Sequence, residues 1–285
     1  MMQNTKVKKT GRGKRREWVL GVGLMAGLVG FVFRIPLSRM IGDKGVGFFA
    51  PAMEIFMVSS AMMCYGISKA VAILVKYRAK RDMYKSARKI YQSALVFTIL
   101  FSALMTLFVF FFSEFIAQTF ILEYRGYLAI AAIAPAILLS GLLGVMRGYL
   151  QGMGAMMPTI HSRLLEKFVM LVAGLLLAAA SFSYGEKVAA LLRNTEYAAA
   201  YGAMGASIGV SVACAIGILH IILIRLIYAG TFKQQLMNDT AKYVESNGQV
   251  ISTFFSAALP YMICALLYKI HYLVDQRVFN YAMNK

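Results

Sequence analysis

The sequence predicts an all-α integral membrane protein with seven transmembrane helices and a cytoplasmic N-terminus. Of its 285 residues 60% are hydrophobic, and the mean hydropathy is +0.66. Soluble domains have an apolar share of about 45–50%. Seven apolar stretches each reach the ~20 residues that a helix needs to cross a bilayer. Basic residues concentrate in alternate connections between these stretches, as the topology of a multi-pass protein of the cytoplasmic membrane requires.

The apolar stretches cover approximately residues 18–41, 46–75, 90–112, 127–145, 158–182, 198–228 and 252–279. None alternates apolar and polar residues with a period of two, which argues against the strands of a membrane barrel. The first stretch is too long for the apolar part of a cleaved signal peptide and lacks a small-residue cleavage site. We therefore expect it to remain in the membrane as a helix.

Lys and Arg side chains indicate the orientation. Seven precede residue 18 and seven more lie in residues 76–89, whereas the connections predicted outside hold only Lys44, Arg125, Lys187 and Arg193. Positive loops stay in the cytoplasm, so the formal charge of +18 follows from topology and does not indicate nucleic-acid binding. We expect these basic segments to contact anionic membrane lipids. The three cysteines lie within apolar stretches without metal-ligand spacing, and no cofactor is expected.

The first span carries Gly23, Gly27, Gly30 and Arg34 on one helix face. An Arg at membrane depth costs roughly 2.5–3.5 kcal/mol and typically faces a bundle interior or a wet cavity. Pro36 predicts a kink just beyond it. The alternative is that the glycines form a helix-packing seam of the GxxxG kind. The stripe therefore predicts either a cavity wall ending in a cation or a close helix contact.

The second span places Glu54, Tyr65 and Lys69 within about 60° of one another on an α-helical wheel. Glu54 lies at a depth comparable with Arg34 on the antiparallel neighbour, which predicts an ion pair between them. Lys69 is close enough to the cytoplasmic end that its ammonium group has snorkelling to the headgroups as an alternative role.

The seventh span has the longest polar stripe. Tyr261, Tyr268, His271, Tyr272 and Asp275 fall within roughly 80° of one face. One interpretation is structural, with ordinary tyrosine contacts and a hydrogen bond between His271 and Asp275 at i, i+4. The other is the wall of a water-filled cavity, in which His271 and Asp275 carry a coupling proton or cation.

The most specific string is GVMRGYLQGMGAMMPTIHSRLLEKF, between spans four and five. It resembles the R-G-Y-x-Q-G-x-x-x-x-x-P-T-x-x-S-x-x-x-E segment of the polysaccharide transporter and stage V sporulation protein B group. That group belongs to the superfamily of lipid II flippases and multidrug and toxin exporters. The resemblance implies a cytoplasmic gate formed by the matching residues, which are Arg147, Gly148, Tyr149, Gln151, Gly152, Pro158, Thr159, Ser162 and Glu166.

Three further segments are similar to the same group: RIPLSRMIGDKGVGFFAPAMEIF, GISKAVAILV and LVDQRVF. The resemblance implies that Arg34 and Lys69 are cavity cations and that Asp275 is the acid of the seventh helix. Arg163 and Lys167 depart from the group, which commonly has glutamine at these two positions.

Members of this superfamily have two lobes related by a pseudo-twofold axis and about twice as many helices as this chain. The resemblance therefore predicts a basic tail at 1–17, a first six-helix lobe at 18–228, a cytoplasmic linker at 229–250 and the first helix of a second lobe at 251–285. We expect a truncated product or one part of a split transporter.

The function implied by the resemblance is that of a flippase. It moves a lipid-linked oligosaccharide, or a polysaccharide or peptidoglycan precursor, across the cytoplasmic membrane by alternating access, and we expect this chain alone to be inactive. Alternatives are a multidrug and toxin cation antiporter, which requires unpaired cavity acids, and a degenerate non-transporting membrane protein. An enzyme acting on lipid phosphates is disfavoured, because the three histidines lie on separate spans.

Overall fold

The computed structural model describes residues 3–121, 124–230, 234, 237, 239 and 246–283, without describing the side chains of residues 3–20, 22–24, 26, 120, 121, 247, 279 and 283. Most of the predicted linker, 229–250, lies outside these residues. The described chain contains helices and no strand, which confirms the all-α prediction. Its elements are α1 (Gln3–Ser60), the π-helix η1 (Ala61–Ile67), α2 (Ser68–Ala79), α3 (Tyr84–Phe111), α4 (Ser113–Ile116), the π-helix η2 (Ala117–Ile121), the 3₁₀ helix η3 (Tyr124–Gly126), α5 (Tyr127–Gly152), α6 (Met156–Leu192), α7 (Glu196–Ile227) and α9 (Asn247–Met283).

The first long helix holds two membrane crossings. Six helices in the described chain are long and apolar enough to span a membrane, and the first of these, Gly27–Ala79, has 53 residues. A straight helix of that length would measure about 80 Å, more than twice the ~30 Å hydrocarbon core. Gly42 breaks it with φ 71° and ψ 175°, a conformation that glycine adopts without steric cost. The chain reverses at Gly42, six residues beyond Pro36, where the sequence predicted a kink.

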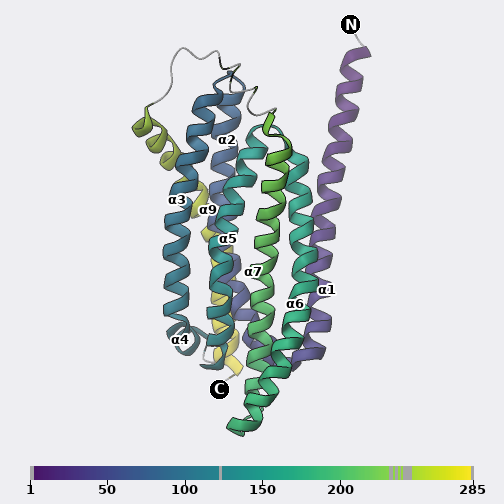
Figure 1. The fold of residues 1–285 in the computed structure, drawn as a ribbon, viewed down its shortest axis with the longest axis vertical. Helices are drawn as coiled ribbons and strands as arrows, with labels where there is room; N and C mark the ends of the chain where they lie inside the picture. The colour runs from purple at the N-terminus through teal and green to yellow at the C-terminus, as the bar shows by residue number, and fades with distance from the viewer. Residues whose placement is uncertain are drawn as a thin grey trace.

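The two ends of the chain lie at opposite ends of the bundle. The N-terminus, the α2–α3 turn and the α5–α6 turn lie at the upper end in Figure 1, and the C-terminus lies at the lower end. The described chain therefore makes an odd number of passes, in agreement with seven spans.

Ion pairs reduce the positive charge of the lower end. Lys44 Nζ lies 2.6 Å from Glu196 Oε1, and Arg125 pairs with the same carboxylate. One acid thus neutralises two of the four basic residues predicted outside.

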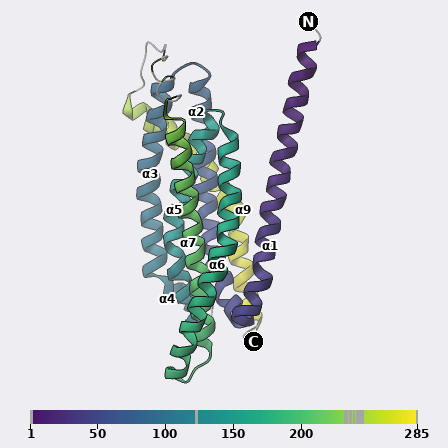
Figure 2. The same cartoon turned by 45° about the vertical axis from the view of Figure 1, so that its right-hand side comes forward.

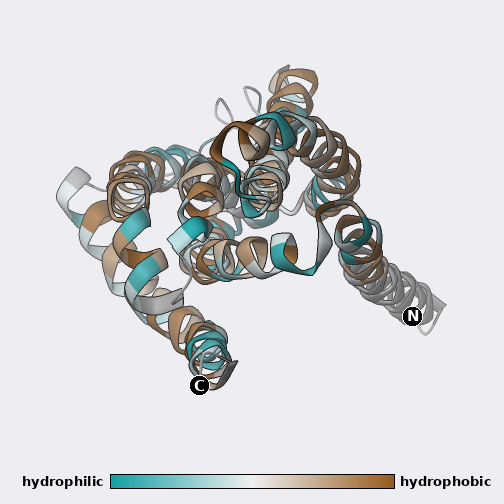
Figure 3. Ribbon diagram, turned by 90° about the horizontal axis from the view of Figure 1, so that it is seen from below, coloured by the Kyte–Doolittle hydropathy of each residue, from teal (hydrophilic) through white to brown (hydrophobic). Residues whose placement is uncertain are grey.

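Helix α5 lies at the centre of the packing. It contacts α2, α3 and α7, and its Ile130, Ile133 and Ile137 are fully buried. Small residues allow the close approach that membrane helices need, since lipid offers no hydrophobic drive for association. A Cβ on Gly148 would lie 2.6 Å from the backbone oxygen of Ser68. Figure 3, seen from the lower end, shows brown apolar segments interrupted by teal hydrophilic ones along the helices.

Helix α9 docks on the outside of this arrangement, against η1, α1, α2 and α3. Figure 2 shows its lower part running beside the lower part of α1. A Cβ on Gly66 would lie 2.9 Å from Met262 Cα, so the glycine permits the contact between η1 and α9. The π-helix η1 is therefore held between α5 on one side and α9 on the other.

The glycine face of the first span is open. A Cβ added at Gly27 or Gly30 would meet nothing within 4 Å, and Gly23 lies outside the residues with described side chains. The same span packs through Phe33, Leu37 and Ile41, which are buried. The glycines of the described segment thus make no packing seam within this chain, and Arg34 lies on an exposed face.

Candidate functional site

Three predicted charges from different spans come together at the lower half of the bundle. Arg34, on the first half of α1, attracts Glu54 on the second half, and Asp275 on α9 repels it. Arg34 and Asp275 are exposed and Glu54 is half-buried. The predicted ion pair between Arg34 and Glu54 is not formed among the described residues, and Glu54 Oε2 is buried without a hydrogen-bond partner. The three charges interact over a longer range.

Glu54 opens into a cavity of about 380 Å³, here called the Glu54 pocket. It lies between the second half of α1, the region of α3 and α4, and α9. Most of its wall is apolar, with Phe108, Phe115 and Leu273 among the lining residues, while Gln276 and Arg277 add polar groups from α9. The pocket therefore combines one carboxylate and one guanidinium with a surface suited to an acyl or prenyl chain.

The predicted α9 stripe is largely exposed. Tyr268 is 72% exposed, and His271 packs on Tyr272 with ring centroids 4.1 Å apart. The Lys269 ammonium lies 4.5 Å from the centre of the Tyr272 ring. No hydrogen bond joins His271 to Asp275 in the described chain, so the structural interpretation of that pair is not met. A face with this many polar groups at membrane depth typically borders water or protein.

The stripe predicted on the second span assumed an unbroken α-helix, and the π-helix η1 interrupts that helix. A π-helix takes more residues per turn than an α-helix, since its hydrogen bonds run from i to i+5. Side chains beyond η1 are therefore rotated away from their α-helical positions. Glu54 lines one pocket, whereas Tyr65 and Lys69 line another.

This second cavity, the α2–α6 pocket, has a volume of about 280 Å³. Tyr65 and Lys69 come from η1 and α2, Gln151 from the end of α5, and Thr159 and Arg163 from the start of α6. The Arg163 guanidinium lies 5.3 Å from the centre of the Tyr65 ring. The structure thus joins four predicted residues with Arg163, which the sequence indicated only as a departure from the related group.

Other motif residues form a buried polar cluster behind this pocket, here called the Arg147 network. Arg147 is only 3% exposed. Its Nη2 donates hydrogen bonds to Ser162 Oγ at 2.8 Å and to Glu166 Oε2 at 2.7 Å. Ser162 in turn donates to the backbone oxygen of Gly217 at 3.5 Å. The network connects α5, α6 and α7, while Gly148 and Gly152 seat α5 against α2 and Pro158 lies in the first turn of α6.

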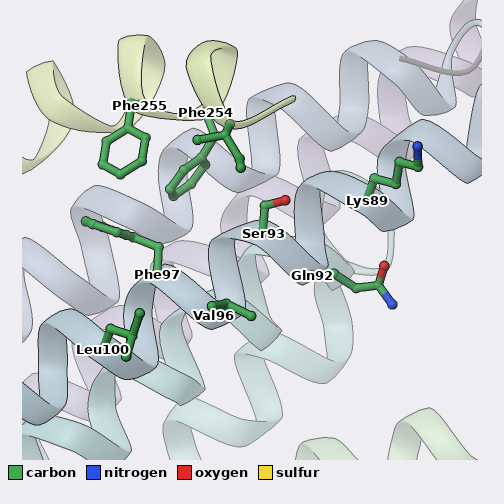
Figure 4. Close-up of a pocket in the computed structure, with 9 residues that line it drawn as sticks. Lys89, Gln92, Ser93, Val96, Phe97, Leu100, Phe254 and Phe255 are labelled. Atoms are coloured by element: carbon green, nitrogen blue, oxygen red, sulfur yellow. The ribbon is translucent and has the colours of Figure 1, made fainter. Parts of the chain in front are cut away.

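Two features at the upper end of the bundle were not predicted from the sequence: a hydrogen bond between α7 and α3, and a groove between α3 and α9. Arg225 Nη1 donates a 2.7 Å hydrogen bond to Tyr91 Oη, and the ring of Tyr91 lies 4.7 Å from that of Tyr149. A groove of about 490 Å³ lies between α3 and α9 (Figure 4). Lys89 is near one end of it, and Phe97 and Phe255 form an aromatic wall at the other. Both depend on contacts between distant segments, and the only local signal was an Arg near the end of a span.

Comparison with solved structures finds a similar fold in a MOP superfamily transporter from Pyrococcus furiosus, whose binding pocket is described as having reverse polarity. The TM-score is 0.58 at 13% sequence identity, and the match covers 87% of this chain and 50% of that one. At this identity the likeness concerns the fold alone.

Two curated proteins of Bacillus subtilis (strain 168) are similar in sequence. Stage V sporulation protein B is 26% identical over 242 residues, which are 85% of this chain and 44% of the relative. Lipid II flippase MurJ is 24% identical over 284 residues, which are 94% of this chain and 49% of the relative. The chain thus spans about half the length of these relatives. Residues 16–284 match the family of polysaccharide biosynthesis proteins, and the chain belongs to this family.

Proposed function

We propose that the chain is the membrane-embedded part of a flippase for a lipid-linked oligosaccharide, or a polysaccharide or peptidoglycan precursor, with its N-terminus in the cytoplasm. Family membership supports a flippase-type transporter as the general class. The lipid-linked saccharide as substrate, its movement across the membrane and the cytoplasmic position of the N-terminus are what we propose beyond that class. Residues 18–228 would form one lobe, and 251–285 would begin a second.

The observation that carries the proposal is the exposure of polar groups at membrane depth in two regions of the bundle. Arg34, His271 and Asp275 are exposed in one region, and Lys69 and the 55% exposed Tyr65 line the α2–α6 pocket in the other. Exposed charge is costly against lipid tails, so both regions are suited to an aqueous cavity. Tyr261, Tyr268 and Tyr272 would supply surfaces for sugar rings.

The chemistry follows from the residue types. A guanidinium makes paired hydrogen bonds to phosphate oxygens, and an ammonium adds a compact charge. Lys69 in the α2–α6 pocket and Arg34 in the lower half of the bundle would each contact the phosphate-bearing head of the substrate, at different depths, while its lipid tail remains in the bilayer. No covalent bond forms or breaks. Rocking of two lobes around the site would expose it to each side in turn, so we expect this chain alone to bind substrate without completing transport.

Coupling to an ion gradient would use the acids of the same face. Glu54 and Asp275 repel each other electrostatically, and a proton or monovalent cation shared near them would relieve that repulsion. His271, four residues before Asp275, is a second candidate for carrying a proton.

The test is binding of a fluorescent prenyl-diphosphate-linked saccharide to the purified chain. We expect Arg34→Ala and Lys69→Ala each to weaken binding roughly tenfold, the effect of losing one charge-assisted contact. Lys80→Ala, in the exposed α2–α3 turn, is the matched control and should bind like the wild type. Flipping in vesicles should appear only when a second lobe is supplied as a fusion.

Two results would contradict the proposal. Tighter binding of a lipophilic cation than of the lipid-linked saccharide would favour a cation antiporter. Binding of neither ligand, with or without the second lobe, would favour a non-transporting membrane protein.

A further inference from the structure

The α2–α6 pocket has an excess of positive charge that no acid of the described chain neutralises. Lys69 and Arg163 line it, and its lining residues include no Asp or Glu. The nearby carboxylate of Glu166 is already paired with Arg147 at 2.7 Å. Neither Lys69 nor Arg163 forms an ion pair among the described residues. The pocket thus presents two cations to whatever occupies it.

A buried hydroxyl in the same wall also lacks a partner. Thr159 is only 2% exposed, and its Oγ1 has no hydrogen-bond partner in the described structure. Buried polar atoms are nearly always bonded, because an unsatisfied one loses its water without compensation. Thr159 lines the pocket, so a small rotation of its side chain would let this hydroxyl donate to a ligand with acceptor oxygens.

The start of α6 adds a third contribution. This 37-residue helix begins at Met156 with no side-chain cap and no acidic residue in its first turn. The N-terminal end of a helix carries partial positive charge and favours anions. Thr159 lies in this first turn, and Arg163 lies one turn later on the same side.

From these three observations we propose that the α2–α6 pocket is a phosphoryl subsite that binds a diphosphate. Two cations, a hydroxyl donor and a helix N-terminus match a multiply charged anion with several acceptor oxygens. The volume of about 280 Å³ is near the lower limit of ~300–1,000 Å³ for small-molecule sites, and is therefore too small for a diphosphate together with its saccharide. The inference rests on the proposed flippase function, for which it names the group held nearest the α5–α6 turn.

The probe is inorganic pyrophosphate, titrated calorimetrically into the purified full chain. We expect binding to weaken roughly tenfold to a hundredfold in Arg163→Gln and in Lys69→Gln, since each removes one charge-assisted contact. Lys187→Gln removes an exposed cation at the far end of α6 and should leave binding unchanged. Thermal unfolding of each variant checks that it is folded.

The role of the Thr159 hydroxyl is tested with a second variant and its matched control. Thr98 on α3 is fully buried and its Oγ1 also lacks a partner, but it does not line the pocket. Thr159→Val and Thr98→Val should each keep or raise the stability of the empty protein, because each removes an unsatisfied buried hydroxyl. Only Thr159→Val should weaken pyrophosphate binding, about tenfold.

A second arm separates this inference from the proposed function. Competition of the lipid-linked saccharide with pyrophosphate, lost in Arg163→Gln, supports both. Pyrophosphate binding without such competition supports a subsite for a soluble phosphoryl compound and contradicts the substrate assignment. Saccharide binding that neither competes with pyrophosphate nor responds to Arg163→Gln overturns the subsite and leaves the flippase function standing. Absence of pyrophosphate binding to the wild type also overturns it.

Discussion

The Arg147 network near the α5–α6 turn and the open face around Arg34 both carry charge within long helices, but of the two only the network has its charges paired among the described residues. Arg147 is 3% exposed and bonded to Ser162 and Glu166. Arg34 is exposed, and the nearby Glu54 keeps a buried oxygen without a partner. Charges that satisfy one another hold helices together, whereas charges left without partners are available to a ligand. The contrast separates the architecture of this chain from its candidate site.

The largest expected effect tests the structural side of the contrast. Arg147→Ala should lower the free energy of unfolding by up to about 3 kcal/mol, because it leaves the partly buried Glu166 carboxylate without its partner. Denaturant titration of the purified chain measures this. Arg34→Ala, the matched control, should change the unfolding free energy by less than about 1 kcal/mol.

The double variant Arg147→Met with Glu166→Leu should recover most of the lost stability, because it removes both charges together. An equal loss of stability in Arg147→Ala and Arg34→Ala would remove the distinction between the two regions.

Substitution of glycines should change stability by an intermediate amount, and it compares a packed helix face at Gly148 with an open one at Gly27. Gly148→Ala places a Cβ 2.6 Å from the backbone oxygen of Ser68 and should cost roughly 1–3 kcal/mol through overpacking. Gly27→Ala meets nothing within 4 Å and should stabilise its helix by up to about 1 kcal/mol. Melting temperatures in detergent compare the two variants, and a loss of stability at Gly27 would show that its face is packed.

The smallest effect concerns the long-range interaction on the open face. A double-mutant cycle with Arg34→Gln and Glu54→Gln should give a coupling free energy of about 1 kcal/mol or less, as expected for charges that act through a partly solvated gap. The cycle with Arg147→Gln and Glu166→Gln should give a larger value. Equal coupling in the two cycles would show that Arg34 and Glu54 form a close pair.

Much of the site was accessible from the sequence because membrane burial makes polar residues conspicuous. Arg34, Glu54 and Asp275 stand out in apolar spans, and the structure brings Arg34 and Asp275 within electrostatic range of Glu54. Gln151 and Thr159 were predicted through the motif that they share with Arg147 and Glu166. The motif did not show that these residues divide between a pocket wall and a buried network.

Other elements depend on contacts that no local pattern encodes. The helical wheel assumed an unbroken α-helix from Glu54 to Lys69, whereas η1 lies between them and the two residues line different pockets. Two helices approach the π-helix closely. Gly144 of α5 faces it, and a Cβ there would lie 2.6 Å from Cys64 Cα. On the other side, Gly66 of the π-helix itself faces α9. Its register thus reflects packing from two sides.

The sequence by itself determined that the chain is helical, how often it crosses the membrane and which end is basic, because apolar length and charge act locally along the chain. Only the tertiary structure decided the Gly42 reversal, the partners of Arg147 and the meeting of Lys69, Thr159 and Arg163 in one pocket. Each of these depends on how helices distant in sequence approach one another, through backbone contacts that glycines permit and that composition does not specify.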